Sequence, residues 1–172
     1  MNLKDEKHQK AEGYIELKFG PRWKYISAAR GFIQNFLAIS SAGNNIKENI
    51  ADKISMAASE LLENAVKYAS GEETHIFVSI APMAKKVIVS VENHASGESI
   101  DSLEEAFKRI SKDKPLEAYL EAMKTAATRE DGKSQLGLVR IRYETGGELN
   151  MRISDDNMVT ITLKVSSEVK NK

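Results

Sequence analysis

The chain has 172 residues, no cysteine and a formal net charge of zero, with 41% hydrophobic and 29% charged residues. This composition is typical of one soluble domain, and the lack of cysteine excludes disulfides, thiol catalysis and cysteine-ligated zinc. The balanced charge argues against nucleic-acid binding, which usually needs a basic excess. We expect neither a secretory signal nor a membrane span, and therefore a cytoplasmic protein.

The first part of the chain predicts one strand and two long helices. Residues 14–20 alternate apolar and polar side chains, as in a half-buried strand. Apolar residues at helical spacing predict helices over residues 22–39 and 46–69, with a loop at 41–45 between them and Gly71 as the stop of the second helix.

The rest of the chain predicts two hairpins separated by helices. Ser99 or Asp101 is the expected N-cap of the first of these helices. A short helix is expected after the Gly-containing loop that begins at Asp131. The other expected elements are strands at 75–80 and 86–93, helices at 99–110 and 115–130, and strands at 147–154 and 157–165.

Strands that come in pairs divided by helices predict an α+β fold. We expect a two-layer sandwich, with a mixed, mostly antiparallel sheet and helices on one face. The expected organisation is a flexible N-terminus at residues 1–12, one domain at 13–166 and a flexible tail at 167–172.

The stretch "ASELLENAVKYAS", residues 58–70, carries the most specific pattern. Projected at 100° per residue, Glu60, Asn64 and Lys67 fall on a stripe about 60° wide, opposite the apolar arc of the helix. A solvated helix face explains Glu and Lys, but Asn is a mediocre helix former. A carboxylate one turn before a carboxamide can instead hold a water and a metal-bound phosphate. Both interpretations remain open from the pattern alone.

The run "ELLENAVKYA" resembles the N-box of the GHKL superfamily, which includes gyrase, Hsp90, histidine kinases, MutL and the anti-sigma-factor serine kinases. The resemblance implies that Asn64 coordinates Mg²⁺ bridging the nucleotide phosphates. It also implies that Glu60 is the general base and that Lys67 lies near the phosphates. The family likewise places this box on a long helix before a hairpin.

The other two nucleotide boxes of the family are degenerate here. The stretch "ENHASG" matches the adenine-binding box, with Asn93, Ala95 and Gly97 where the family has Asp, Gly and Gly or Ala. Asn93 still offers a carbonyl acceptor but lacks the charge of an aspartate.

The stretch "KSQLGLVRIR" matches the third box. It retains Leu136 and Gly137, and Lys133 stands at the position of a family glycine. Lys133 and Ser134 can themselves donate hydrogen bonds to phosphate, as the missing backbone cradle would have done.

Two functions remain open at this point. One is a regulatory ATP-binding protein similar to the anti-sigma-factor serine kinases, with weak or altered nucleotide binding. Such proteins often form homodimers and bind a sigma factor or an antagonist phosphoprotein; as an enzyme, the chain would be an ATP- and Mg²⁺-dependent protein serine kinase or ATPase. The alternative is a non-catalytic docking protein that has lost ATP binding. The second interpretation gains if the two helical runs within residues 98–131 pack over the pocket instead of forming a mobile lid.

Overall fold

The computed structural model describes residues 13–44, 48–81, 85–112, 114–128 and 136–167. The termini expected to be flexible fall outside these ranges, apart from Ser167, whose amide donates a hydrogen bond to the carbonyl of Lys85. The strands are β1 (Gly13–Phe19), β2 (Ala69–Ala81), β3 (Lys86–Ala95), β4 (Glu148–Ile153) and β5 (Met158–Ser166). The helices are the 3-10 helix η1 (Trp23–Tyr25), α2 (Ile26–Asn44), α3 (Glu48–Tyr68), α4 (Gly97–Lys112), α5 (Pro115–Thr128) and α6 (Leu136–Thr145).

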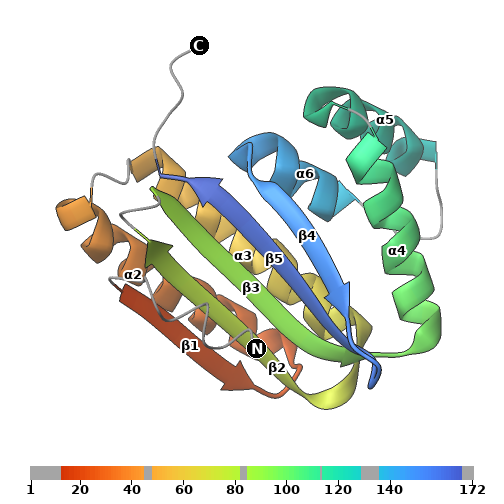
Figure 1. The fold of residues 1–172 in the computed structure, drawn as a ribbon, viewed down its shortest axis with the longest axis horizontal. Coiled ribbons are helices and arrows are strands. Elements are labelled where there is room, and N and C mark those ends of the chain that lie inside the picture. Colours follow the sequence, from red (N-terminus) through yellow and green to blue (C-terminus); the bar gives the residue numbers. More distant parts are fainter. Residues whose placement is uncertain (1–12, 45–47, 82–84, 113, 129–135, 168–172) are drawn as a thin grey trace.

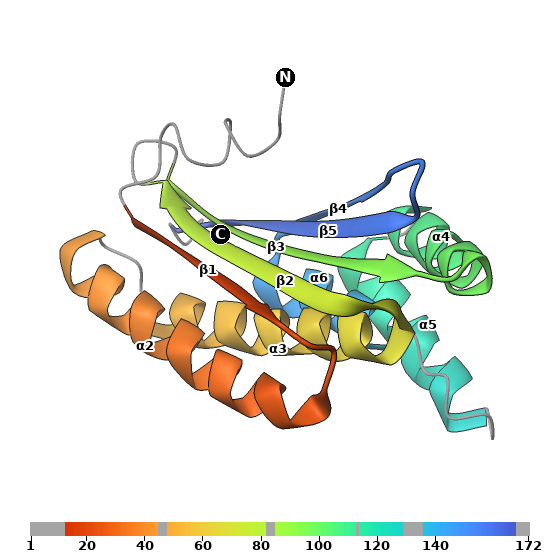
Figure 2. The same cartoon turned by 90° about the horizontal axis from the view of Figure 1, so that it is seen from below.

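The strands form a five-stranded sheet in the order β1-β2-β3-β5-β4, and every pairing is antiparallel. The layers are plain in Figures 1 and 2: α2, α3 and α6 cover one face of the sheet, α4 follows the end of β3, and α5 lies beside α6. The α+β prediction and both predicted hairpins are therefore confirmed, but the described strands form an antiparallel sheet and not the mixed one that was expected.

The core lies between the sheet and α3. Alternate residues of β2, namely Ile76, Val78 and Ile80, point into it and are at most 2% exposed. From α3, Leu61 and Leu62 pack against them with at most 1% exposed. Burying these side chains stabilises the fold by about 1.5–3 kcal/mol each, which fixes the orientation of α3 and hence of its opposite face.

Several helix boundaries differ from the predictions, and the helix predicted from residue 22 begins as η1, with α2 starting at Ile26. Helix α2 continues to Asn44, where a loop was predicted, because Ser and Ala are tolerated in helices and one Gly costs only about 1 kcal/mol. Helix α3 ends at Tyr68 and β2 follows at once, so Gly71 lies in a strand. The N-cap of α4 is Ser96, whose hydroxyl accepts a hydrogen bond from the amide of Ser99 at 3.3 Å; the Ser99 and Asp101 predictions were wrong.

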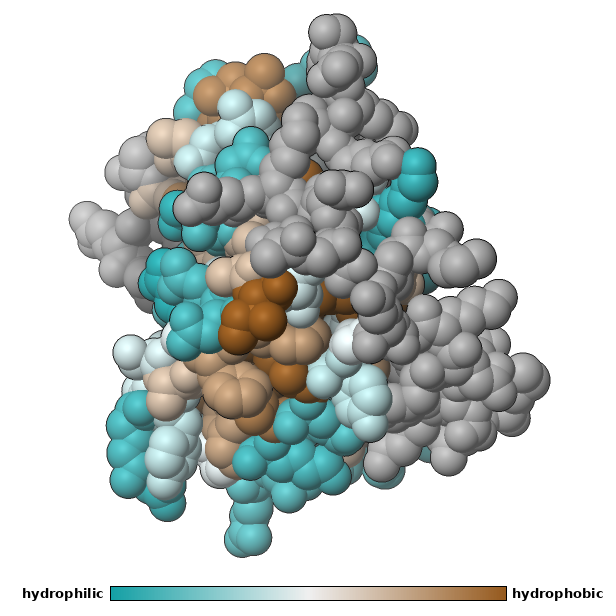
Figure 3. Space-filling view, turned by 90° about the vertical axis from the view of Figure 1, so that its left-hand side faces the viewer, coloured by the Kyte–Doolittle hydropathy of each residue, from teal (hydrophilic) through white to brown (hydrophobic). Residues whose placement is uncertain are grey.

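Large hydrophobic side chains are exposed on several elements, including the long helices α2 and α5. On α2, Phe32 and Ile39 are 53% and 77% exposed, and on α5 the exposed apolar residues are Leu116, Leu120 and Met123. Figure 3 shows that hydrophobic surface gathers in the middle of one side of the molecule, between hydrophilic areas. Exposed apolar surface of this kind often contacts a partner.

Candidate functional site

Helices α3 and α6 bring together residues from two of the predicted boxes. A Cβ atom added to Gly137, the second residue of α6, would lie 2.6 Å from Oε2 of Glu60 and 3.6 Å from Nδ2 of Asn64. Glycine therefore leaves room for the carboxylate of Glu60, which a larger residue at this position would displace. The stripe that the helix projection placed opposite the apolar arc thus faces α6 at Glu60 and Asn64.

The carboxylate of Glu60 lies in an environment that disfavours its charge. Burial raises the pKa of Glu60 above its ordinary 4.5, and the neighbouring carboxylates of Glu63 and Glu144 raise it further. Arg140 opposes this rise through an ion pair, with its Nη1 3.6 Å from Oε1 of Glu60. A carboxylate with a raised pKa is the kind of group that serves as a general base near neutral pH.

The side-chain amide of Asn64 is buried, and within the described part of the chain its Nδ2 has no hydrogen-bond partner. A buried donor without a partner costs about 1–3 kcal/mol, so such a group calls for a ligand or a water. The oxygen and nitrogen of an Asn side chain are interchangeable by a flip, so either atom can face the cavity.

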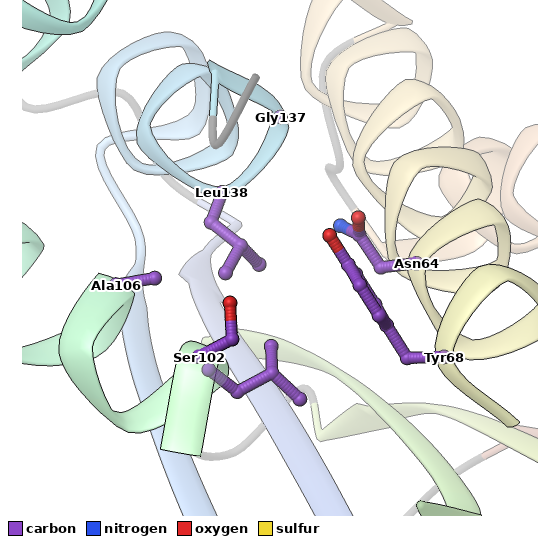
Figure 4. Close-up of a pocket in the computed structure, with 7 residues that line it drawn as sticks. Asn64, Tyr68, Ser102, Ala106, Gly137 and Leu138 are labelled. Carbon is purple, nitrogen blue, oxygen red and sulfur yellow. The ribbon is translucent and has the colours of Figure 1, made fainter. Parts of the chain in front are cut away.

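Asn64 lines a cavity of about 20 Å³ together with Tyr68, Ser102, Leu103, Ala106, Gly137 and Leu138. Figure 4 shows the side chains of Asn64 and Tyr68 projecting from α3 towards Leu138 of α6 and Ser102 of α4. The volume accommodates about one water molecule. A nucleotide is many times larger and does not fit within this volume.

Helix α4 forms one wall of the cavity. Its residues Leu103, Ala106 and Ile110 are buried, with 7%, 3% and 3% exposed. Leu103 also lines a second cavity of about 10 Å³, which lies between Asn64 and Asn93. The first helix of the segment between the boxes therefore packs over the pocket, one of the two arrangements considered from the sequence.

The predicted adenine-box residues are held by structural contacts. Asn93 is 6% exposed, and its amide donates a hydrogen bond to the carbonyl of His94 at 3.1 Å. Ala95 is buried, and its amide donates to the carbonyl of Asn157. Gly97 is exposed at the start of α4, and an added Cβ there would meet nothing within 4 Å.

The remaining predicted residues contribute less to the site. Lys67 is exposed, and its Nζ lies 5.3 Å from the centre of the Tyr68 ring. Leu136 begins α6 beside Gly137. Lys133 and Ser134 lie outside the described residues.

Three residues at the site were missed by the sequence analysis. Leu103 belongs to the amphipathic pattern of α4. This pattern predicts that Leu103 is buried but does not indicate which surface α4 covers. Tyr68 was overlooked, although it follows Asn64 by one helical turn. Arg140 follows Gly137 by three residues and so shares its helix face, a spacing that could have indicated its position.

Another polar cluster lies on the sheet. His75 lies between two carboxylates on the sheet, with Nε2 2.7 Å from Glu16 and Nδ1 3.3 Å from Glu92. Among the described residues, no group of three or more His, Cys, Asp or Glu could hold a metal ion. No helix in the described ranges is long and apolar enough to cross a membrane.

Comparison with known proteins identifies the family. Residues 49–168 match the family of histidine kinase-, DNA gyrase B- and HSP90-like ATPases. The chain belongs to this family. The matched region contains α3, α6 and the sheet from β2 onwards, which includes all ten predicted site residues. The GHKL resemblance is therefore confirmed at the level of the family.

A chain in the crystal structure of the SiaB–SiaC complex from Pseudomonas aeruginosa has a similar fold, with a TM-score of 0.65 and 17% sequence identity. The match covers 96% of this chain and 98% of that chain, so the whole fold is shared. No curated protein matches the chain.

The residues present fit a nucleotide at one end of the site only. At the proposed phosphate end, the unpaired Nδ2 of Asn64 can donate a hydrogen bond to a phosphate oxygen, and the side-chain oxygen of Asn64 is the kind of ligand that Mg²⁺ prefers. The close approach at Gly137 leaves no side chain in the way. At the base end, Leu103 occupies the space beside Asn93.

Proposed function

We propose that this protein is a regulatory ATP-binding protein of the protein serine kinase type, which acts on a partner protein and binds nucleotide only when α4 moves. The observation that carries the proposal is the convergence of Glu60, Asn64 and Gly137 at the junction of α3 and α6. A docking protein has no physical need for a half-buried carboxylate beside an unpaired amide.

Each of these residues has a role in the proposed reaction. Asn64 would hold the Mg²⁺ that accompanies the nucleotide. The nucleotide would supply the phosphoryl group. Glu60 would accept the proton of a serine hydroxyl on the partner, a task for which its raised pKa is suited. The backbone at Gly137 would lie against phosphate. Phosphoryl transfer depends mainly on positioning and on neutralising charge, so few groups suffice.

The comparison with SiaB–SiaC supports a partner protein. The similar chain is part of a complex of two proteins. That chain and the present protein share their fold over nearly their whole length. Exposed apolar side chains on α2 and α5 offer surface for such a contact.

A second candidate is a docking protein that has lost nucleotide chemistry. The observation that favours it is the packing of α4, since Leu103 and Ala106 are buried where a nucleotide would lie. Asn93 in place of an aspartate also weakens adenine recognition.

Calorimetric titration with ATP and ADP, with and without Mg²⁺, separates the two candidates. We expect Mg²⁺-dependent binding that the Asn64→Ala variant loses and the matched variant Asn35→Ala, an exposed Asn on α2, retains. ADP formation from ATP, compared between the wild type and Glu60→Gln, then tests catalysis. Absence of heat and of any thermal shift at millimolar nucleotide would favour the docking protein.

A further inference from the structure

The guanidinium of Arg140 lies at the site but is assigned no role by the nucleotide boxes. Arg140 shares a face of α6 with Gly137 and Glu144, at spacings of three and four residues. Its Nε donates a hydrogen bond to Oε1 of Glu144 at 2.7 Å, and its Nη1 lies 3.6 Å from Oε1 of Glu60. One cation thus stands between two carboxylates from different helices.

The two contacts differ in strength. The contact with Glu144 is a short hydrogen bond within one helix, whereas the contact with Glu60 is a longer ion pair without a hydrogen bond. The side chains of Arg140 and Glu60 are 41% and 26% exposed, and partly exposed ion pairs contribute little to stability. The contact between Arg140 and Glu60 is therefore the one that breaks at small cost.

The charges at the site make such a change necessary when an anion enters. Glu60 places negative charge beside Gly137, where the proposed phosphate would lie, and Glu63 and Glu144 add negative charge near Glu60. Lys67 contacts the ring of Tyr68 instead. A planar guanidinium can bind a phosphate through two hydrogen bonds, which an ammonium group cannot do in the same way.

We propose that Arg140 is an anion-binding residue of the site: it pairs with Glu60 while the site is closed and transfers to a nucleotide phosphate that enters beside Gly137. The transfer releases the carboxylate of Glu60. This inference rests on the proposed function, because it deepens the role of the same site.

The test is a double-mutant cycle in ATP affinity, measured by calorimetry on the full chain with Mg²⁺. We expect Arg140→Gln to weaken binding by roughly tenfold or more, as loss of a charge-assisted hydrogen bond does. Arg140→Lys keeps the positive charge but loses the planar guanidinium that can form two hydrogen bonds. It should therefore weaken ATP binding less than Arg140→Gln does. Glu144→Gln should strengthen binding because it frees Arg140.

The double variant Arg140→Gln/Glu144→Gln distinguishes this mechanism from a general charge effect. If Glu144 acts through Arg140, its substitution has no effect once Arg140 is gone. Arg109→Gln is the matched control, because Arg109 forms an exposed ion pair with Glu105 at the same four-residue spacing on α4. It should leave ATP affinity unchanged.

The outcomes also separate this inference from the proposed function. Wild-type binding of Mg²⁺–ATP that Arg140→Gln leaves unchanged would overturn the role of Arg140 alone. If the wild type does not bind ATP but Glu144→Gln binds inorganic triphosphate in an Arg140-dependent manner, anion binding stands and the proposed function fails. No binding of ATP or triphosphate by any variant at millimolar concentration overturns both.

Discussion

Truncation of Leu103 tests whether α4 controls access to the site. Leu103 is 7% exposed and lines both cavities, so its side chain contributes to the closed conformation directly. We expect Leu103→Ala to destabilise the fold and, at the same time, to strengthen Mg²⁺–ATP binding. A mutation that only damaged the protein would lower both its stability and its affinity for Mg²⁺–ATP.

The magnitude follows from the packing of Leu103. Buried Leu→Ala substitutions cost about 2–5 kcal/mol, and the cavities already present beside Leu103 favour the lower end. If about 2 kcal/mol of closed-state stability is lost and the open state is unaffected, the apparent affinity rises by up to roughly 30-fold, because 1.4 kcal/mol corresponds to a factor of ten. This is an upper bound, since an open α4 retains some contacts.

Chemical denaturation and calorimetric titration on the same preparations provide the two measurements. Leu37→Ala is the matched control, because Leu37 is fully buried in α2 but lines neither cavity. It should lose similar stability without any gain in affinity. Equal affinities for the wild type and Leu103→Ala, alongside the expected loss of stability, would refute the view that α4 excludes the nucleotide.

Three further predictions concern the junction of α3 and α6. Gly137→Ala should leave stability nearly unchanged but abolish activity. The new Cβ would lie 2.6 Å from Oε2 of Glu60, and ordinary contact begins at 3.4 Å, so this flexible carboxylate must move by about 0.8 Å. A large fall in melting temperature would show that the backbone moves instead. Asn64→Ala should abolish Mg²⁺-dependent nucleotide binding with an unchanged or slightly higher melting temperature, because it removes an unpaired buried amide; a fall of several degrees would make Asn64 a structural residue. Glu60→Gln should gain stability relative to the wild type at pH 7 but not at pH 4. Burial raises the folded-state pKa of Glu60 above 4.5, so the stability that the protonated carboxyl contributes at low pH is lost as the pH rises through the raised value; a denaturation series that shows no pH-dependent difference would contradict this.

The fold could be predicted because its signals are local. The alternation in β2 and the broad apolar arc of α3 each report which residues face the core, and the β2–β3 and β4–β5 pairings follow from their short connections. The N-box added what periodicity could not, namely that Glu60 and Asn64 belong to one site.

The contacts of that site could not be predicted from periodicity, because they join segments far apart in the sequence. The helix projection placed Glu60 and Asn64 on a polar stripe, and such a stripe reads equally as solvent-facing or as packed against another helix. The approach of Gly137 to Glu60 settles the choice, and it depends on how α6 lies across α3. The same applies to α4, whose amphipathic pattern predicts a buried face without indicating what it covers.

In the proposed site, two features of the base end limit nucleotide binding for different reasons. The proposed phosphate end is not limited in this way, because α3 and α6 approach each other directly at Gly137. The proposed base end is covered by α4, and moving this helix would expose Leu103 and Ile110 to water at a cost of about 1.5–3 kcal/mol for each fully exposed side chain. Asn93 weakens the base end separately, through the missing charge. Truncation of Leu103 weakens only the packing of α4 and leaves Asn93 unchanged. If Leu103→Ala gains affinity and still binds ATP weakly, the remaining loss of affinity is assigned to Asn93.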